Sequence, residues 1–314
     1  MINYNYLQRL LHNILLGSKF IKKSIYEIEK IIFLKNNNIK NNKHIFITGM
    51  PRSGTTSLLN FLDKSEGLCS LKYKDMPFIM APNIAKLFKK AKIKKTQRFH
   101  NDNIFFDLES PESFDEVFFS IYKNAEIHEE LLNYISLILF SYGKFRYLSK
   151  NNNNFRRINL IKEIFPNSIF LLPIREPLQH AYSLYSQHLN FIELQKNNTF
   201  ILKYMNFLGH NEFGLNHHYW FKPVKHKNLL NINYWLEQWC LYYEFILNNF
   251  SDKPYCHNIV YENFKKNNFL RSLGLYENIN ILSKDYFNIS RKKIKIEYDE
   301  ELYNKAMNIY NKYI

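Results

Sequence analysis

The pattern of apolar and polar residues predicts a chain in which helices alternate with short buried strands. Between about residues 6 and 34, leucines and isoleucines recur at helical spacing with lysines between them. The polar tract 35–43 predicts a loop, and the apolar residues 45–47 then predict a strand. Two more apolar runs, at 169–174 and 257–261, predict further buried strands.

The segments between these strands carry helical patterns. Pro177 stands just after the second strand, at the position where a helix begins. Strands that alternate with helices indicate a parallel sheet covered on both faces, which is the α/β class. The predicted helices span 55–63, 107–130, 158–165 and 229–250, and a last one begins at Asp299.

Composition excludes several classes of protein. Of the 314 residues 46% are hydrophobic and 17% aromatic, which excludes a disordered chain. Eight Gly, nine Pro and three Cys exclude collagen-like and disulfide-scaffold classes. The cysteines are far apart and form no CxxC pair, so a zinc ribbon is excluded and a reducing compartment is favoured.

The net charge of +15 favours anionic partners without identifying them, because the Asn- and Lys-rich composition is typical of an AT-rich coding sequence. No nucleic-acid-binding module is recognisable, so we expect no nucleic-acid partner. No apolar run approaches the ~20 residues that span a bilayer, and no signal peptide is evident. We therefore expect a cytoplasmic protein without a transmembrane segment.

The most informative segment is Gly49-Met-Pro-Arg-Ser-Gly-Thr-Thr56, which joins a predicted strand to a predicted helix. This arrangement aims several backbone N–H groups at one point, where the helix dipole adds about half a positive charge. Gly49 and Gly54 permit close backbone approach, and Arg52 adds a planar set of donors. The segment predicts a site for a tetrahedral anion; an unrelated strand–turn–helix junction is the alternative. Hydroxyl donors come from Ser53, Thr55 and Thr56.

The segment nearly matches the phosphate-binding pattern GxxxxGK[ST], but Thr55 occupies the lysine position. In nucleoside triphosphatases that lysine reaches the β- and γ-phosphates, so its absence argues against hydrolysis of ATP or GTP. The cation has instead moved inside the loop, to Arg52.

Gly49-Met-Pro-Arg-Ser-Gly-Thr-Thr56 resembles the 5′-phosphosulfate loop of sulfotransferases that use 3′-phosphoadenylyl sulfate (PAPS). Its Pro-Arg-Ser-Gly-Thr-Thr form is like that of tyrosylprotein and bacterial carbohydrate-type sulfotransferases. The resemblance implies the P-loop NTPase-like sulfotransferase fold, with PAPS as cosubstrate and no metal requirement. The chain itself has no carboxylate cluster or His/Cys spacing typical of a metal site. The residues implied to bind PAPS here are Arg52, Ser53, Gly54, Thr55, Thr56 and Ser57.

A second segment, Ile174-Arg-Glu-Pro-Leu-Gln-His-Ala-Tyr-Ser183, resembles the 3′-phosphate site of the same family. A strand that ends at Ile174 puts Arg175 at the carboxyl edge of the sheet, where open α/β folds bind ligands. Ser183 follows two helical turns later and is placed to face the same phosphate. A salt bridge from Arg175 to a carboxylate is the alternative.

Two shorter matches extend the resemblance over about residues 44–264. Lys150 resembles the lysine that precedes the strand of the 3′-phosphate arginine, although the usual Lys-Ser/Thr-Pro form is absent. Val260-Tyr-Glu-Asn263 resembles the Tyr-Glu-Asp/Asn-Leu element that follows a late core strand. We expect one sulfotransferase-like domain over 1–314, with an N-terminal helical extension (1–43), a core (44–264) and a C-terminal helical tail (265–314).

Sulfuryl transfer by in-line attack needs positioning and stabilisation of the leaving phosphate. Arg52, with the N–H groups of 54–56, fits that role, and Lys150 is the candidate for a second cation, a solvated lysine being the alternative. Asp75 is the candidate general base, because the resemblance implies a carboxylate some twenty positions after the loop arginine. Capping of the turn before Pro77 is the alternative role of Asp75. Further candidates for the base are His100, Glu109, Glu112 and His188.

Two surfaces bear on the acceptor. The basic run 86–98 is either a rim that attracts anions or a solvated helix face. The segment 205–223 carries Phe207, His210, Phe213, Trp220 and Phe221, which line an acceptor pocket or pack in the core. The acceptor is a hydroxyl or amine compound such as a carbohydrate, a peptide or a small molecule. The alternatives to a sulfotransferase are a P-loop small-molecule or nucleotide kinase and a non-catalytic anion-binding protein.

Overall fold

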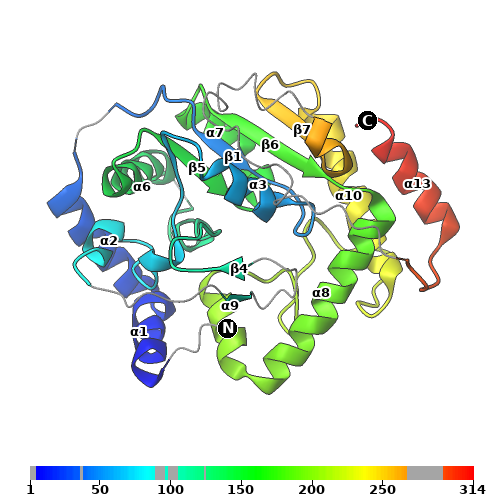
Figure 1. The fold of residues 1–314 in the computed structure, drawn as a ribbon, viewed down its shortest axis with the longest axis horizontal. Helices are drawn as coiled ribbons and strands as arrows, with labels where there is room; N and C mark the ends of the chain where they lie inside the picture. The colour runs from blue at the N-terminus through cyan, green and yellow to red at the C-terminus, as the bar shows by residue number, and fades with distance from the viewer. Residues whose placement is uncertain (1–4, 36–37, 89–95, 98–104, 124, 267–292) are drawn as a thin grey trace.

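The computed structural model describes residues 5–35, 38–88, 96–97, 105–123, 125–266 and 293–314. Its main sheet has five parallel strands in the order β2-β5-β1-β6-β7 (Figure 1). A two-stranded antiparallel pair, β3 (Thr96–Gln97) and β4 (Phe105–Phe106), lies apart from it. The strands of the sheet are β1 (Ile45–Ile47), β2 (Leu68–Cys69), β5 (Arg146–Lys150), β6 (Ile169–Ile174) and β7 (Cys256–Val260).

Helices cover both faces of this sheet, as the α/β prediction requires. The larger helices are α1 (Tyr6–Gly17), α2 (Lys19–Phe33), α3 (Thr55–Leu62), α6 (Ile127–Tyr142), α7 (Ile158–Ile164), α8 (Pro177–Asn197), α9 (Thr199–Phe207), α10 (Ile232–Phe250) and α13 (Glu300–Tyr310). Shorter turns of helix are α4 (Pro82–Ala85), α5 (Glu116–Phe119), η1 (Tyr73–Asp75), η2 (Asn154–Arg156) and η3 (Tyr261–Lys266).

Successive side chains of the central strand β1 point to opposite faces of the sheet, and the core accordingly has two layers, one on each face. Ile45 and Ile47 pack with Leu58, Leu59 and Leu62 of α3 on one face of the sheet. Phe46 points to the other face and joins the larger core, to which α6, α7, α8 and α10 contribute. All three β1 residues are buried, which explains their uninterrupted apolar run.

The predicted strands at 45–47, 169–174 and 257–261 are confirmed, the last with a one-residue shift. The predicted helices at 55–63, 158–165 and 229–250, and the one after Asp299, are confirmed with small shifts of their ends. The region 107–130 is not one helix, because only 116–119 and the start of α6 are helical there. The apolar pattern of 6–34 is divided between two helices, since Ser18 ends α1 and caps α2.

The helix α2 is tied to the core by a buried carboxylate. Glu29 is fully buried and accepts hydrogen bonds from the backbone N–H groups of Asn83 and Ile84 and from the Asn83 side chain. These donors lie at the start of α4, so Glu29 completes the N-terminus of that short helix. Burial raises the pKa of Glu29, although the three hydrogen bonds oppose the rise.

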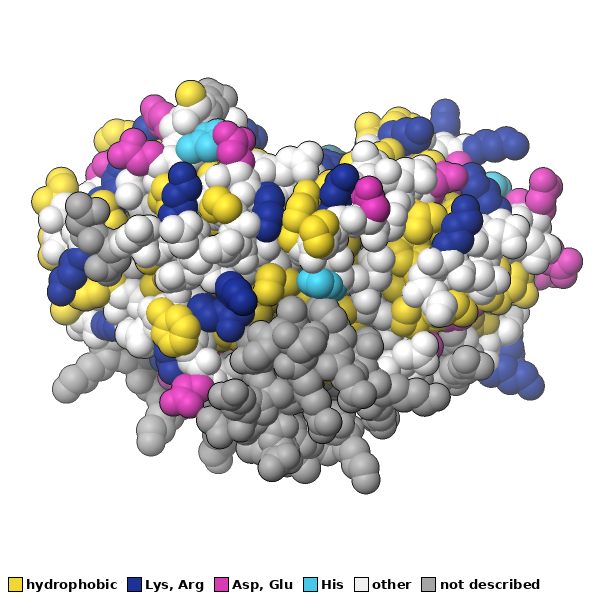
Figure 2. Space-filling view, turned by 90° about the horizontal axis from the view of Figure 1, so that it is seen from above, with side chains coloured by type: hydrophobic (Ala, Val, Ile, Leu, Met, Phe, Trp, Pro, Cys, Tyr) yellow, Lys and Arg dark blue, Asp and Glu magenta, His cyan; other side chains and the backbone are white. Residues whose placement is uncertain are grey.

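Charge is dispersed on the face that Figure 2 shows, where Lys and Arg side chains alternate with apolar and uncharged ones. Among the described residues of that face, the basic side chains form no continuous patch. Within the described parts of the chain, no helix has the length and apolar character needed to cross a bilayer.

We predict that Glu29→Ala lowers the free energy of unfolding by about 2–4 kcal/mol, because it leaves buried donors at the start of α4 without an acceptor. Glu27→Ala is the matched control, since Glu27 is half-exposed, pairs with Lys30 in α2 and accepts only a long hydrogen bond of 3.4 Å from the hydroxyl of Tyr122 among its described contacts. We expect the control to cost less than about 1 kcal/mol. Urea unfolding followed by circular dichroism measures both, and equal losses would contradict the assigned role of Glu29.

Candidate functional site

The loop after β1 has the geometry of an anion-binding turn. Gly54 adopts φ 101° and Arg52 adopts φ 70°, a left-handed conformation that is unusual for a residue with a side chain. The helix α3 then begins at Thr55 with no side chain capping its N-terminus. The N–H groups of its first turn therefore have no acceptor within the helix and point toward the loop. The left-handed conformation of Arg52 in the same loop is a strained one for a residue with a side chain.

A tyrosine that follows the edge strand β7 packs over this loop. A Cβ atom built on Gly54 would lie 2.6 Å from Cδ2 of Tyr261, which follows β7. Gly54 is therefore required both by its φ angle and by the close approach of the ring. On the other side of the loop, a Cβ on Gly49 would lie 3.2 Å from the carbonyl oxygen of Pro173 in β6.

The two segments that resemble phosphate sites meet at this loop. Nε of Arg52 donates a hydrogen bond of 3.2 Å to Oγ of Ser183, which lies on α8. One turn earlier on the same helix, Nε2 of His180 donates to the carbonyl oxygen of Pro51 at 2.7 Å. Burial lowers the pKa of His180 to about 3, so the ring is neutral and acts as a fixed donor. The helix α8 thus holds the loop at two points.

Arg175 completes a cationic pair beside the loop. It follows the last residue of β6, and its guanidinium carbon lies 5.5 Å from the centroid of the Tyr261 ring. Burial lowers the pKa of Arg175, and repulsion from Arg52 lowers it further, while Tyr261 and Glu262 oppose the shift. Two guanidinium groups close enough to repel each other are stabilised by a ligand that carries more than one negative charge.

Carboxylates on the outer side fix the turn that carries Arg175. Oε1 of Glu262 accepts the N–H of Glu176 at 3.0 Å, and Oε2 of Glu262 accepts the hydroxyl of Tyr310 at 2.8 Å. Tyr303 donates to Oε1 of Glu176 at 3.1 Å. Both tyrosines belong to α13, so the C-terminal helix supports the end of β6 from behind.

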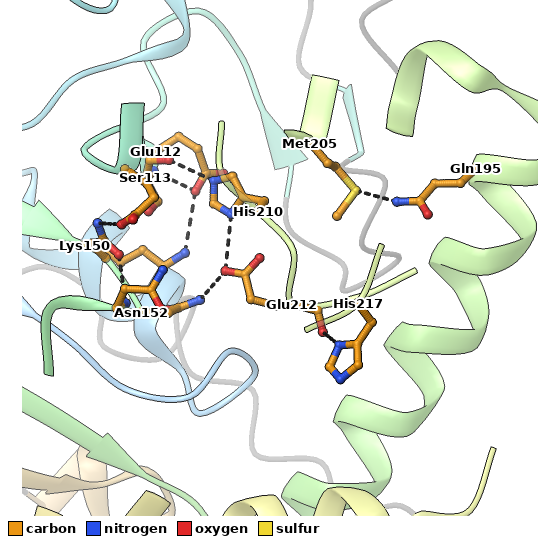
Figure 3. A network of polar contacts seen from close by, with 12 residues as sticks. Glu112, Ser113, Lys150, Asn152, Gln195, Met205, His210, Glu212 and His217 are labelled. Carbon is orange, nitrogen blue, oxygen red and sulfur yellow. Dashed lines mark hydrogen bonds and ion pairs between the residues drawn. The ribbon is translucent and has the colours of Figure 1, made fainter. Parts of the chain in front are cut away.

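A second polar cluster lies at the end of β5, which is next to β1 on the side away from β6. Lys150 is 7% exposed, and its Nζ lies 3.8 Å from Oε1 of Glu112 (Figure 3). The carboxylate of Glu112 also accepts hydrogen bonds from the hydroxyl of Tyr73 at 2.8 Å and the N–H of Ser113 at 2.9 Å. Lys150 is therefore not a solvated lysine: it is buried beside a carboxylate.

His210 and Glu212 complete this cluster (Figure 3). Nδ1 of His210 lies 3.4 Å from Oε1 of Glu212, and the same oxygen accepts a hydrogen bond of 3.2 Å from the Asn152 amide. Burial opposes a charge on His210, but the Glu212 carboxylate outweighs burial and raises the pKa of the ring. Burial likewise would raise the pKa of Glu212, but His210 and Lys150 lower it below its usual value. The raised pKa of His210 favours the protonated ring, and the lowered pKa of Glu212 favours the ionised carboxylate beside it.

Glu212 also lines a cavity of about 480 Å³. The cavity lies between α5, the start of α7 and the segment 209–220. Its size is within the range of small-molecule sites. Among its lining residues are Phe119, Arg156, Arg157, Glu212, Tyr219 and Trp220.

The candidates for a general base are dispersed. The carboxylate of Asp75 is buried and accepts hydrogen bonds from the N–H of Lys72 and the hydroxyl of Tyr142, which are contacts of a turn cap. Glu109 pairs with Lys74 at 2.7 Å on the surface. Nδ1 of His188 accepts the N–H of Gly214, and burial lowers its pKa to about 4. Only Glu112 lies beside Lys150, and His100 is outside the described residues.

The basic run 86–98 and the segment 205–223 were both expected near the acceptor, and the structure describes only the second of them in full. Most of the basic run 86–98 lies outside the described residues; Lys86 itself donates to the carbonyl oxygen of Ser141. In the segment 205–223, Phe213 packs in the core, while Trp220 is buried and also lines the cavity. His210 contributes to the Lys150 cluster, so this segment serves both packing and the site.

Sequence reasoning assigned no role to Glu212. It lies in a segment between α9 and α10 that has no motif of its own. The only signal is the spacing of His210 and Glu212, two positions apart, in a stretch rich in aromatic residues. Nothing in the sequence places that stretch beside the end of β5. Among the residues that the structure describes, no group of three or more His, Cys, Asp or Glu side chains is placed to hold a metal ion.

Comparison with known proteins identifies the family. A model described as the sulfotransferase family matches residues 44–277. Among solved structures, sulfotransferase STF1 from Mycobacterium tuberculosis H37Rv is similar at 10% identity and a TM-score of 0.46, covering 96% of this chain and 81% of that one. Sulfotransferase STF9 from Mycobacterium avium is similar at 11% identity and a TM-score of 0.44, with coverages of 99% and 79%. No curated protein matches. By the family match, which spans most of its length, this chain belongs to the sulfotransferase family.

Proposed function

We propose that this protein transfers a sulfuryl group from PAPS to a hydroxyl or amine acceptor. The observation that carries the proposal is the hydrogen bond of 3.2 Å between Arg52 and Ser183, which joins the two phosphate-site segments. With Arg175 in the same electrostatic neighbourhood, these groups suit a nucleotide that carries phosphates at both its 5′ and 3′ positions. A nucleoside triphosphate has no 3′-phosphate for the second segment to bind. The loop also lacks the lysine that binds the β- and γ-phosphates of nucleoside triphosphates.

The residues divide the nucleotide between them. The 5′-phosphosulfate fits the N-terminus of α3, where the backbone N–H groups of the first turn lack a side-chain cap. The hydroxyl of Ser53 is buried and donates to the carbonyl oxygen of Met50 at 2.7 Å, so it holds the loop in shape. The 3′-phosphate fits Arg175 and Ser183. Arg52 lies between these two groups and interacts with both ends of the ligand. The positions assigned to the 5′ end are Arg52, Ser53, Gly54, Thr55, Thr56 and Ser57.

Transfer then proceeds by in-line displacement. The bond between sulfur and the oxygen of the 5′-phosphate breaks while a bond forms from the acceptor oxygen or nitrogen to sulfur. The departing phosphate keeps the electron pair, and Arg52 with the N–H groups of α3 stabilises its charge. Lys150, at the end of the strand next to β1, stabilises the equatorial sulfate oxygens.

We propose Glu212 as the general base that takes the acceptor's proton. Its carboxylate is 11% exposed, lines the cavity and has a lowered pKa, so it is ionised where an acceptor can reach it. A low pKa makes a weak base toward a free alcohol, but the acceptor proton becomes acidic as its oxygen bonds to sulfur. Asp75 remains the alternative from the sequence, although its two hydrogen bonds hold it in a turn.

The cysteines support a reducing compartment, and we place the protein in the cytoplasm on that basis. Cys69, Cys240 and Cys256 are all free and buried. Burial raises the pKa of each thiol to about 12, so these groups are unreactive.

We predict that 3′-phosphoadenosine 5′-phosphate (PAP) binds without magnesium and that Arg175→Ala weakens this binding about 10- to 100-fold, because a charge-assisted contact to the 3′-phosphate is lost. Binding of adenosine 5′-phosphate, which lacks that phosphate, should change less than about threefold. Isothermal titration calorimetry measures all four constants. Equal losses for the two nucleotides would contradict the assignment, and magnesium-dependent binding of ATP instead of PAP would favour a kinase.

We predict that Glu212→Gln lowers kcat by about 10²–10⁴-fold with the best acceptor from a screen with radiolabelled PAPS, because the amide cannot take a proton. PAP affinity should be unchanged. The matched variant Asp75→Asn should keep most of the activity, once its folding is checked by thermal denaturation. A large loss with Asp75→Asn and none with Glu212→Gln would return the role of base to Asp75.

A further inference from the structure

The cavity beside Glu212 has a distinct distribution of charge. Glu212 lines it, and the oxygen Oε1 of Glu212 contacts His210 and Asn152 of the Lys150 cluster. Its floor includes Glu116 and Arg157, which make a two-pronged ion pair with distances of 2.7 and 2.8 Å. Glu116 is therefore paired with the cation Arg157, and Glu212 lies against the imidazole of His210, whose pKa it raises.

Two further cations of the cavity have no such partner. Lys123 and Arg156 line it and are both exposed. Within the described residues neither forms an ion pair with a carboxylate, and the guanidinium of Arg156 stacks on the ring of Phe155 at 5.1 Å. With Glu116 and Glu212 neutralised locally, these side chains leave the cavity with an excess of positive charge.

The remaining walls combine flat rings with hydrogen-bonding groups. Trp220 lines the cavity but is only 4% exposed, because its ring packs against Phe213 and Trp235. Tyr219 also lines the cavity and is 50% exposed, so its ring has surface free for a ligand. Phe119 lies under the guanidinium of Arg157 at 3.9 Å, which fixes a third ring. Between these rings lie polar side chains that suit the hydroxyl groups of a sugar, namely Ser120, Asn153 and Asn211.

We infer that this cavity binds the acceptor and selects an acidic sugar, a glycan unit that carries a carboxylate or sulfate as well as free hydroxyl groups. The inference rests on the proposed function and names the substrate class of the same site. The sugar ring stacks on Tyr219, one hydroxyl reaches Glu212, and the anionic group pairs with Arg156 and Lys123. A volume of about 480 Å³ accommodates one or two sugar rings.

A matched pair of ligands tests this inference. p-Nitrophenyl β-D-glucuronide and p-nitrophenyl β-D-glucoside differ only at C6, where a carboxylate replaces a hydroxymethyl group. Their dissociation constants are measured by calorimetry with PAP at saturation. We expect the glucuronide to bind about 5- to 10-fold more tightly, as two partly exposed ion pairs allow. The preference should fall as sodium chloride is raised, because screening weakens both pairs.

The double variant Lys123→Gln/Arg156→Gln should reduce the preference to less than about twofold and leave glucoside binding nearly unchanged. Lys196→Gln is the matched control, because Lys196 is an exposed lysine at the end of α8 that does not line the cavity, and it should keep the preference. Equal affinities for the two glycosides, failure of both to bind, or a preference that survives the double variant would each overturn the inference. If PAP itself does not bind, the failure lies in the proposed function instead.

Discussion

The fold holds two arginines, one in the loop after β1 and one at the end of β6, near each other although their charges repel. The rest of the site depends on the contacts that hold these two arginines in place. Arg52 lies close enough to Arg175 to disfavour the charge on the Arg175 guanidinium and to lower its pKa, in addition to the larger effect of burial. Their positions are imposed by the sheet and by α8, which bonds to the loop through Ser183 and through the neutral ring of His180. A scaffold that keeps like charges together without a ligand gives up stability, and a bound polyanion restores it.

The supports of this arrangement come from distant parts of the chain. Tyr261 covers Gly54, and Glu262 holds the N–H of Glu176 at the turn after β6. From the helix α13, the hydroxyls of Tyr303 and Tyr310 donate hydrogen bonds to the carboxylates of Glu176 and Glu262, respectively. Contacts of this kind fix side chains within the tolerance that group transfer needs. They also explain why Gly54, which has a positive φ angle, cannot be replaced by alanine without displacing the ring of Tyr261.

The strands and the anion-binding loop could be predicted from the local sequence pattern. The carboxylate proposed as general base, Glu212, could not. The strand 45–47 and the loop after it are contiguous in sequence, so their residues specify their own geometry. The strand β5 escaped prediction because Arg146 and Lys150 interrupt its apolar pattern, although its interior is buried. Glu212 meets Lys150 only through tertiary packing of an irregular segment, and no periodicity reports such a contact. Asp75 was expected from the family resemblance and its distance in sequence from Arg52. In the structure its carboxylate accepts hydrogen bonds from the N–H of Lys72 within the turn and from the hydroxyl of Tyr142 on α6.

The most direct test of the account is a crystal structure of the protein with PAP bound. The account predicts the 5′-phosphate within hydrogen-bonding distance of the backbone N–H groups of Thr55 and Thr56, and the 3′-phosphate on Arg175 and Ser183, with Arg52 between them. A nucleotide bound elsewhere, or one whose 3′-phosphate faces solvent away from Arg175, would contradict it.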